Sequence, residues 1–318
     1  MNRRSTLKPP IVSILVITYN QKDLMSETLA SCLNQTIDDY EIVVSDDGST
    51  DGTQHVLESI QRLHPEKIRL VLNPVNQGIT ANCNAGLAAC NGRYVALMGG
   101  DDLLLPRKLE RQLSAFLENP RLVLSYHPCH VMRNGTIAEL VGGRAKDIVK
   151  NQIDMIGNFG AQLPGPATMV RADAIPHDGF NSEIRTASDW MYFIDVTSQG
   201  DVERIDEPLA IYRQQGGNVG HRYFSYSDDF LKTLEITSRK YGNRPGVQEA
   251  VRRGGKRFVL GIVYRAVEHG ELCLARVYAK QLTAFSSKHL SRAVTLATWI
   301  PGVTPVFRRS KSLLKRFI

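Results

Sequence analysis

The stretch YEIVVSDDGSTDGT, residues 40–53, runs from a short apolar segment into a turn that holds three aspartates and two glycines. The apolar segment is long enough for a strand and too short for most helices, and such a run is typical of a parallel strand covered on both faces. An amphipathic stretch follows at residues 54–63 and predicts a helix. A strand, a polar turn and a helix therefore form one unit of the chain.

The same unit recurs on both sides of this stretch. Further short apolar runs predict strands at residues 11–19, 68–73 and 93–98. Further helical patterns occupy residues 22–35, with Asn20 as the predicted N-cap, and residues 79–90, which end at Asn91-Gly92. The alternation of strand and helix predicts an α/β fold with a doubly wound, mostly parallel sheet.

Polar turns follow the four predicted strands. They are TYN (18–20), DDGSTDGT (46–53), NPVNQG (73–78) and GGDD (99–102). Because ligands of doubly wound sheets bind at the carboxyl ends of the strands, we expect these turns to converge on one site. The sequence contains neither GxGxxG after the first strand nor a GxxxxGKS or GxxxxGKT loop, which argues against a dinucleotide enzyme or P-loop NTPase. Carboxylates hold phosphate through Mg²⁺ or Mn²⁺, since hard oxygen ligands suit these ions.

The composition indicates a folded protein in a reducing compartment. Of its 318 residues, 42% are hydrophobic, enough for one large domain or two unequal ones. The five cysteines are scattered and show neither a CxxC pair nor a zinc spacing. The basic, partly apolar N-terminus lacks the small-residue cleavage site of a secretory signal, so a cytoplasmic location is expected.

The net charge of +7 hides an asymmetry along the chain. Residues 231–318 contain 18 Lys and Arg against 4 Asp and Glu, whereas residues 1–230 contain 21 against 28. A basic segment of this kind commonly meets phosphate, either in nucleic acid or on an anionic membrane surface.

Five separated motifs resemble those of the family 2 glycosyltransferases, in the same order and at the same spacing. They are VSILVITYN (12–20), EIVVSDDGSTDGT (41–53), NQGITANCNAG (76–86), GGDDLLLP (99–106) and ASDWMYF (187–193). The resemblance implies the GT-A nucleotide-sugar fold over residues 1–225, with a nucleotide-binding half at about 11–115 and an acceptor half at about 116–225. A basic helical C-terminal region over residues 226–318 would follow.

The resemblance also implies a nucleotide site. The turn after the second strand would contact the base and ribose, the tripeptide after the first strand would line the same pocket, and a later Y-R segment would close over the donor phosphates. The implied residues are Thr18, Tyr19, Asn20, Asp46, Asp47, Asn76, Gly100 and Arg213. Cys83 stands where the family usually has Arg, and Gln215 stands where it usually has His. His221 would take the place of that His only if its loop folds back.

The GGDD turn takes the place of the family's DxD motif. Gly99 and Gly100 occupy its first two positions, and Asp101 its metal-binding Asp, so the resemblance implies Asp101 as the ligand of Mn²⁺ or Mg²⁺. Asp102 either binds the metal through water or fixes the turn. A solvated acidic turn at the start of the next helix is the alternative for Asp102.

A catalytic base is implied in TASDWMYF. Inverting sugar transfer needs a base that takes the proton from the attacking hydroxyl, and the family places it in a Glu-Asp pair ahead of an apolar helix. Ser188-Asp189 occupies that pair, which makes Asp189 the predicted base. The alternative is a carboxylate favoured by the helix dipole alone.

The segment YHPCHVMRNGTI (126–137) carries histidines and a cysteine, but its Asn134-Gly135 turn predicts a hairpin better than a zinc site.

The C-terminal region is predicted to be helical and to end in an amphipathic segment. A helical pattern over residues 255–282 is interrupted by Gly270. Residues 293–307 carry no charge, and residues 308–318 mix five cations with apolar side chains. That combination over 293–318 suits an interfacial anchor on anionic lipid, with a helix packed on the catalytic domain as the alternative.

These observations predict a metal-dependent, inverting glycosyltransferase. It would move a sugar from a nucleotide-diphosphate sugar, with a UDP-sugar favoured, to a hydroxyl of a glycan or lipid-linked glycan, at the inner face of the cell membrane. Two alternatives remain open: a degenerate protein that binds a nucleotide sugar without turnover, and a nucleic-acid-binding protein that uses the basic C-terminal region. The second leaves the acidic turns unexplained.

Overall fold

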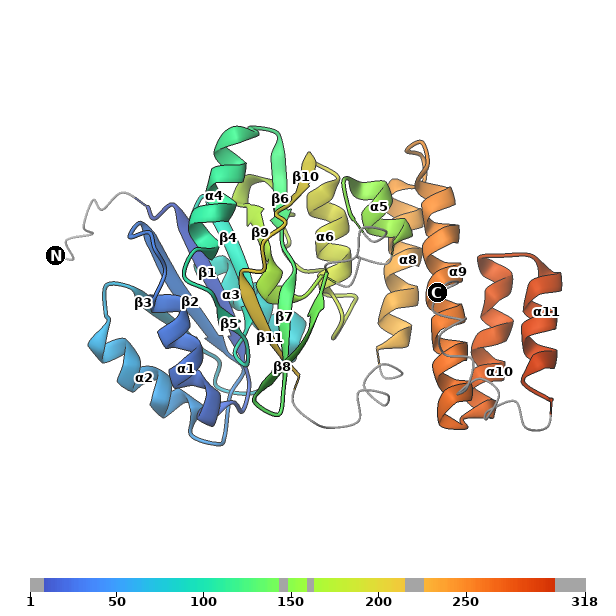
Figure 1. Ribbon diagram of the computed structural model, residues 1–318, viewed down its shortest axis with the longest axis horizontal. Helices are drawn as coiled ribbons and strands as arrows, with labels where there is room; N and C mark the ends of the chain where they lie inside the picture. Colours follow the sequence, from blue (N-terminus) through green and yellow to red (C-terminus); the bar gives the residue numbers. More distant parts are fainter. Residues whose placement is uncertain (1–8, 143–147, 159–162, 215–225, 301–318) are drawn as a thin grey trace. The chain divides into compact units, whose positions relative to one another are not determined.

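A computed structural model describes residues 9–142, 148–158, 163–214 and 226–300. The chain forms two compact units (Figure 1). Unit 1 comprises Met1–Asn151 and Ala161–Gln215, and unit 2 comprises Gln152–Gly160 and Gly216–Ile318. The short segment Gln152–Gly160 lies within the predicted acceptor half but belongs to unit 2.

A seven-stranded sheet forms the centre of unit 1. Its order is β10-β6-β9-β4-β1-β2-β3. The strands are β1 (Val12–Thr18), β2 (Tyr40–Asp46), β3 (Ile68–Leu72), β4 (Tyr94–Gly99), β6 (Leu122–Tyr126), β9 (Thr168–Arg171) and β10 (Asp201–Arg204). All neighbours pair in parallel except β9, which runs antiparallel to β4 and β6. The predicted mostly parallel sheet is confirmed.

The register of the central strands brings the polar turns together. Thr18, the last residue of β1, lies beside Asp46 of β2, and Ile17 lies beside Gly99 of β4. Strands β1, β2 and β4 therefore end at the same edge of the sheet, and the turns that follow them begin side by side.

Helices cover both faces of this sheet. Side chains from α1 (Lys22–Leu33), α2 (Thr53–Leu63) and α4 (Lys108–Glu118) share one core cluster with Ile14 and Val16 of β1. The intervening Leu15 faces α3 (Ile79–Ala89), because a Cβ on Gly86 of that helix would lie 2.6 Å from Leu15 Cδ1. Alternate residues of β1 thus serve opposite faces, which explains why this strand is an almost continuous apolar run.

A second sheet has the order β5-β11-β7-β8. Its strands are β5 (Leu103–Leu104), β7 (Cys129–Arg133), β8 (Thr136–Val141) and β11 (Ala210–Gln214). The β7–β8 pair is the predicted hairpin, with φ of 49° at Asn134 and 77° at Gly135. Two left-handed residues suit a tight hairpin turn.

The predicted capping role of Asn20 is wrong. Helix α1 begins at Lys22 with Gln21 in the N-cap position, and no side chain caps it. Asn20 lies one residue too early and adopts a left-handed φ of 53°. Its side-chain oxygen instead accepts a hydrogen bond from the N–H of Thr50 in the turn after β2.

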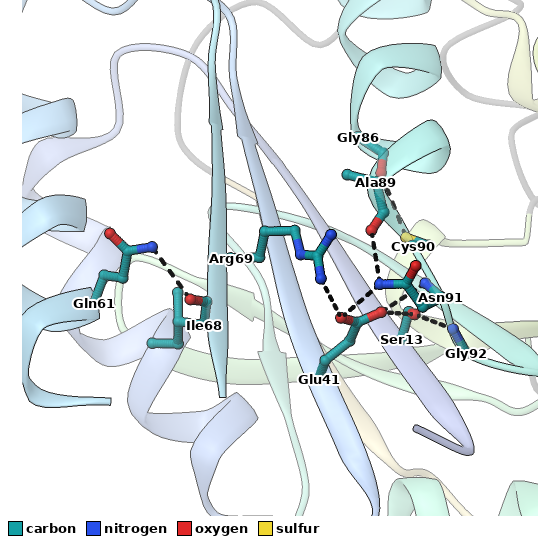
Figure 2. Close-up of polar contacts among 10 residues, drawn as sticks. All are labelled: Ser13, Glu41, Gln61, Ile68, Arg69, Gly86, Ala89, Cys90, Asn91 and Gly92. Atoms are coloured by element: carbon teal, nitrogen blue, oxygen red, sulfur yellow. Dashed lines mark hydrogen bonds and ion pairs between the residues drawn. The ribbon is translucent and has the colours of Figure 1, made fainter. Parts of the chain in front are cut away.

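A buried carboxylate ties together the amino ends of the central strands. Glu41 of β2 accepts hydrogen bonds from Ser13 Oγ of β1 at 2.7 Å and from the N–H of Asn91 at 2.6 Å. Figure 2 shows the carboxylate between these groups and Arg69 of β3, whose guanidinium lies 3.8 Å away. Gly92 also donates its N–H to Ser13 Oγ. One side chain thus connects β1, β2, β3 and the segment entering β4.

Replacing Glu41 by Ala is expected to lower the free energy of unfolding by about 2–4 kcal/mol, because the Ser13 hydroxyl and the Asn91 N–H lose their acceptor. Urea denaturation followed by circular dichroism measures this change. Glu58→Ala, on the exposed face of α2, is the control and should change stability by less than about 0.5 kcal/mol. Equal effects of the two substitutions would contradict a structural role of the Glu41 network.

Unit 2 is helical. Its helices are α5 (Gln152–Gly157), α8 (Ser227–Tyr241), α9 (Val247–His269), α10 (Leu272–Gln281) and α11 (Lys288–Ala297). Gly270, with φ of 86°, ends α9, which confirms the predicted helix break. Phe258 and Ile262 of α9 pack with Tyr278 of α10 in the core of this unit. Among the described residues, no helix has both the length and the apolar character needed to cross a membrane.

Candidate active site

The turn after β1 is hydrogen-bonded to the turn after β2. The Asn20 N–H donates to Ser49 Oγ at 2.8 Å, and Asn20 Oδ1 accepts from the Thr50 N–H at 2.9 Å. Thr18 is buried, whereas Tyr19 is 45% exposed and Asn20 is exposed as well. Of the three nucleotide contacts predicted in this turn, Tyr19 and Asn20 therefore present their side chains to solvent.

Asp46 holds the turn after β2 from within. Its carboxylate is fully buried and accepts hydrogen bonds from the Ser49 N–H at 3.0 Å, from Ser49 Oγ and from Gln54 Nε2 at 2.6 Å. The described residues thus satisfy both carboxylate oxygens. The role that the structure gives Asp46 is to shape this turn, and its contact with a nucleotide stays a prediction.

Asp47 connects the turn after β2 to the turn after β3. Its two carboxylate oxygens accept from the backbone N–H groups of Gln77 at 2.8 Å and Gly78 at 3.0 Å. Its own N–H donates to the Thr18 carbonyl at 3.0 Å. Asn76 is exposed, and its side-chain oxygen accepts from Gly78. One aspartate therefore joins three of the four predicted turns.

Gly100 connects the fourth turn to the first. Its N–H donates to the Ile17 carbonyl at 2.8 Å. A Cβ at Gly100 would lie 2.6 Å from Met25 Cε and 2.9 Å from Thr18 Cβ. The position has no space for a side chain, so glycine lets the turn after β4 lie against the turn after β1.

Asp102 fixes strand β11 rather than facing solvent. It is 2% exposed, and its Oδ1 accepts from the Arg213 N–H at 3.0 Å. Burial, together with the charge of Asp101, raises the pKa of Asp102 well above the ordinary aspartate value. Asp101 is more accessible than Asp102. Of the two roles left open for Asp102, the structure supports fixing the turn.

Arg213 is a buried cation beside this turn. Its Nη2 forms an ion pair with Glu27 of α1. Its Nη1 is buried and has no hydrogen-bond partner among the described residues. A buried guanidinium nitrogen without a partner is costly, and an anionic ligand would satisfy it. Gln215 and His221, considered for the same segment, lie outside the described residues.

The amino end of α6 (Asp189–Thr197) is held against α3. Thr80 of α3 donates to the carbonyls of Ile184 and Arg185, at 2.7 and 2.9 Å, and its hydroxyl lies 2.8 Å from Ser188 Oγ. The Ser188 side chain is therefore occupied in anchoring this segment. These contacts place Asp189, the first residue of α6, next to the turn that Asp47 holds.

Asp189, the predicted base, is exposed at the start of α6. Solvent reaches its side chain, yet the surrounding protein raises the pKa of its carboxyl by desolvation. Burial also raises the pKa of the nearby Cys83 thiol to about 12, and the negative charges of Asp189 and Asp47 contribute. Both carboxylates therefore act on Cys83 and belong to one electrostatic environment.

The turn after β4, which holds Asp101 and Asp102, suits a metal ion that binds together with a diphosphate. Carboxylate oxygens are the donors that Mg²⁺ and Mn²⁺ prefer. Within the described part of the chain, no group of three or more His, Cys, Asp or Glu side chains could hold a metal ion. A metal held by Asp101 would take its other ligands from outside the described groups, and oxygen atoms of a bound diphosphate are of the type that suits it.

Comparison with known proteins identifies the family. Residues 13–154 match the family described as Glycosyl transferase family 2. A protein of Haemophilus influenzae named as an uncharacterized glycosyltransferase is 28% identical over 243 residues, which cover 73% of this chain and 74% of that protein. Residues 13–154 of this chain form a glycosyl transferase family 2 domain. The predicted enzyme class, a glycosyltransferase, is confirmed.

Another relative matches over a shorter span. A Bacillus subtilis protein named as the putative teichuronic acid biosynthesis glycosyltransferase TuaG is 36% identical over 109 residues, or 34% of this chain. The chain spans 43% of that relative's length.

Solved structures share the fold of this family 2 chain. Staphylococcus aureus TarS residues 1–349 in complex with UDP-GlcNAc give a TM-score of 0.65 at 15% identity, covering 94% of this chain and 92% of TarS. The mannosyltransferase PcManGT of Pyrobaculum calidifontis in complex with GDP-Man and Mn²⁺ gives 0.59 at 15% identity, covering 96% and 87%. At such identities the likeness establishes the fold alone, and it supports the predicted GT-A class.

Sequence reasoning on this family 2 chain did not find several residues that shape the site. Thr80 gives no local signal, because its partners lie more than 100 residues away. Glu27 is one of several charged residues on the outer face of α1 and becomes notable only through its contact with buried Arg213.

Proposed function

We propose that this protein is a metal-dependent, inverting glycosyltransferase that moves a sugar from a nucleotide-diphosphate sugar to an acceptor hydroxyl. The observation that carries the proposal is the hydrogen bonding between the polar turns at the carboxyl edge of the sheet. In the fourth turn Asp101 precedes Asp102, which accepts from the N–H of Arg213, and the buried Nη1 of Arg213 has no partner among the described residues. The carboxylates of Asp47 and Asp189 both act on Cys83. We expect the diphosphate at Asp101 and Arg213 and the reacting hydroxyl at Asp189.

Asp189 would act as the base. Its carboxylate accepts the proton of the acceptor hydroxyl while that oxygen attacks the anomeric carbon from the side opposite the leaving diphosphate. Attack from that side inverts the configuration of the anomeric carbon. The raised pKa of Asp189 brings it closer to that of an effective general base near neutral pH. A bound Mn²⁺ or Mg²⁺ would supply positive charge at the departing diphosphate.

For the donor we propose a UDP-sugar. The TarS structure, which covers most of this chain, holds UDP-GlcNAc. The mannosyltransferase structure holds GDP-Man, so a guanine nucleotide is the competing donor. Exposed Tyr19, Asn20 and Asn76 are the residues that we expect to contact the base and ribose.

For the acceptor we propose a hydroxyl of a glycan in surface-polysaccharide synthesis. The name of the relative TuaG, a putative teichuronic acid biosynthesis glycosyltransferase, supports this assignment. A lipid-linked glycan at the inner face of the cell membrane is the acceptor that agrees with the basic C-terminal region.

Thermal unfolding with nucleotides tests the donor site. We expect UDP to raise the melting temperature by several degrees in the presence of Mn²⁺, since a ligand at 100 times its Kd adds about 2.7 kcal/mol to stability. GDP, dTDP and CMP serve as comparisons, each with and without Mn²⁺.

A Mn²⁺-dependent rise of the melting temperature with GDP alone would indicate a GDP-sugar as the donor in place of a UDP-sugar. No shift with any nucleotide would contradict the proposal, and salt-sensitive binding of an oligonucleotide in its place would favour the nucleic-acid alternative. A UDP shift without release of UDP from UDP-sugars in the presence of acceptor would indicate a binding protein without turnover.

A further inference from the structure

Helix α11 and the residues directly after it carry an exposed apolar surface in unit 2. Leu296, Trp299 and Ile300 are 68%, 63% and 58% exposed. Val277 of α10 is 55% exposed, and its neighbour Arg276 places its guanidinium 3.5 Å from the centre of the Trp299 ring. We define these five residues as the α11 surface. Large apolar side chains gathered on one surface commonly mark an interaction site.

The opposite face of α11 packs against unit 2. Ser291 is buried and donates its hydroxyl to the Ala279 carbonyl at 2.7 Å. Thr298 is buried as well and lies beside Arg276, which donates to both its carbonyl and its hydroxyl oxygens. The helix is thus docked through one face, and the apolar residues lie on the face that this packing leaves outside.

Positive charge accompanies this surface. Lys288, His289 and Arg292 are exposed on α11. Arg292 and Leu296 are four residues apart, so they lie on the same side of the helix. From Leu272 to Ile318 the chain has nine Lys and Arg and no Asp or Glu. The surface therefore changes from basic to apolar along one helix, in a region without a single acidic residue.

We infer that the α11 surface docks on an anionic lipid bilayer. Tryptophan and aliphatic side chains enter the boundary between headgroups and acyl chains, while Lys and Arg remain at the level of the anionic headgroups. Arg276 stacked on Trp299 suits that boundary, because its stem is apolar and its head stays hydrated. Nucleic acid would be attracted by the charge but would leave the exposed leucine and isoleucine in water.

The inference deepens the proposed function by giving a place where a lipid-linked acceptor is met, and it rests on that function only for the acceptor. Docking itself needs no donor, metal or turnover. A failure of docking and a failure of the donor site are therefore separate results: the first is seen with vesicles and the second in nucleotide-dependent melting.

Tryptophan fluorescence offers a direct test, because the chain has two tryptophans. Trp190 is buried in unit 1, and Trp299 is exposed. With the full-length protein and vesicles of phosphatidylcholine containing about one third phosphatidylglycerol, we expect a blue shift of the emission and quenching by brominated lipid. Trp190→Phe should retain both signals, and Trp299→Phe should lose them.

Two double substitutions separate the contributions of apolar and charged residues. Leu296→Gln with Ile300→Gln should weaken vesicle binding about 10-fold or more through the loss of apolar insertion. Lys288→Gln with Arg292→Gln should weaken it about 10-fold to 30-fold at low salt, and less at high salt. Leu117→Gln, at an equally exposed leucine on α4 of unit 1, is the matched control and should bind as wild type does.

Three results would overturn the inference. If brominated lipid did not quench the tryptophan fluorescence of the wild-type protein, the surface would not enter the bilayer. Protection of Trp299 from acrylamide before lipid is added, abolished by deletion of residues 301–318, would show that the chain's own C-terminal segment covers it. A concentration-dependent dimer broken by the Leu296 and Ile300 substitutions would assign the surface to a second copy.

Discussion

Replacing Asp189 by Asn is expected to lower the rate of sugar transfer by about 10²–10⁴-fold, the usual contribution of a general base. The amide keeps the size of the side chain and an oxygen for the N–H of Trp190, to which Oδ1 of Asp189 is bonded at 2.8 Å, but it cannot accept a proton. Donor binding should therefore persist. Steady-state release of UDP in the presence of acceptor, together with the UDP-dependent melting shift, separates the two effects.

The control for this substitution is Asp178→Asn. Asp178 is almost fully exposed beside His177, and its amide variant should retain wild-type transfer within a factor of about two. Full activity of Asp189→Asn would exclude Asp189 as the base and leave it as a carboxylate that favours the start of α6.

The pH dependence of wild type follows from the same residue. A base acts in its deprotonated form, so kcat/KM should fall as the pH falls through the pKa of Asp189. Because desolvation raises that pKa, the acidic limb should lie above the ordinary aspartate value of about 3.9. A limb at or below that value would contradict the assignment.

Replacing Asp101 by Ala is expected to remove the Mn²⁺-dependent part of donor binding and to lower transfer by about 10²-fold or more, since a metal contributes several kcal/mol at a departing diphosphate. The protein should remain folded, because Asp102 rather than Asp101 is bonded to the Arg213 N–H of β11. The measurement is the melting shift with UDP, with and without Mn²⁺, beside transfer activity.

Substitutions of the adjacent Asp102 provide the matched comparison for Asp101→Ala. Asp102→Asn retains an acceptor for the Arg213 N–H and should keep most of the Mn²⁺-dependent shift. Asp102→Ala removes that acceptor and should lower stability by about 1–3 kcal/mol. If Asp102→Asn abolished the Mn²⁺ effect while Asp101→Ala retained it, the two roles would be exchanged.

The alternating part of the fold was predictable because its signals are local. Strands β1 to β4 are short apolar runs, helices α2 and α4 are amphipathic, and the Asn134-Gly135 pair encodes its hairpin turn. Strand β9 has no comparable signal. It spans four residues, and its place between β4 and β6 depends on pairings such as Val170 with Val95 and with Leu124, which join segments far apart in the chain.

The candidate site, like the fold, was predictable only in part. Convergence of the turns followed from strand direction alone, because parallel strands end at one edge. The roles within the turns did not follow, since a carboxylate that binds a ligand and one that binds a loop have the same letter in the sequence. The structural roles of Asp46 and Asp47 become visible only through the donors that fold around them.

The hydrogen bonds that Asp46 and Asp47 make across the turns also bear on the entropy of donor binding. Ordering a flexible backbone costs about 1–2 kcal/mol per residue, so a site that ordered three turn residues on binding would lose roughly 10²–10⁴-fold in affinity. Here the backbone N–H groups of Gln77 and Gly78 already have their acceptors. We therefore expect a nucleotide sugar to meet a preorganised set of turns, with Asp47 contributing to its affinity without touching it.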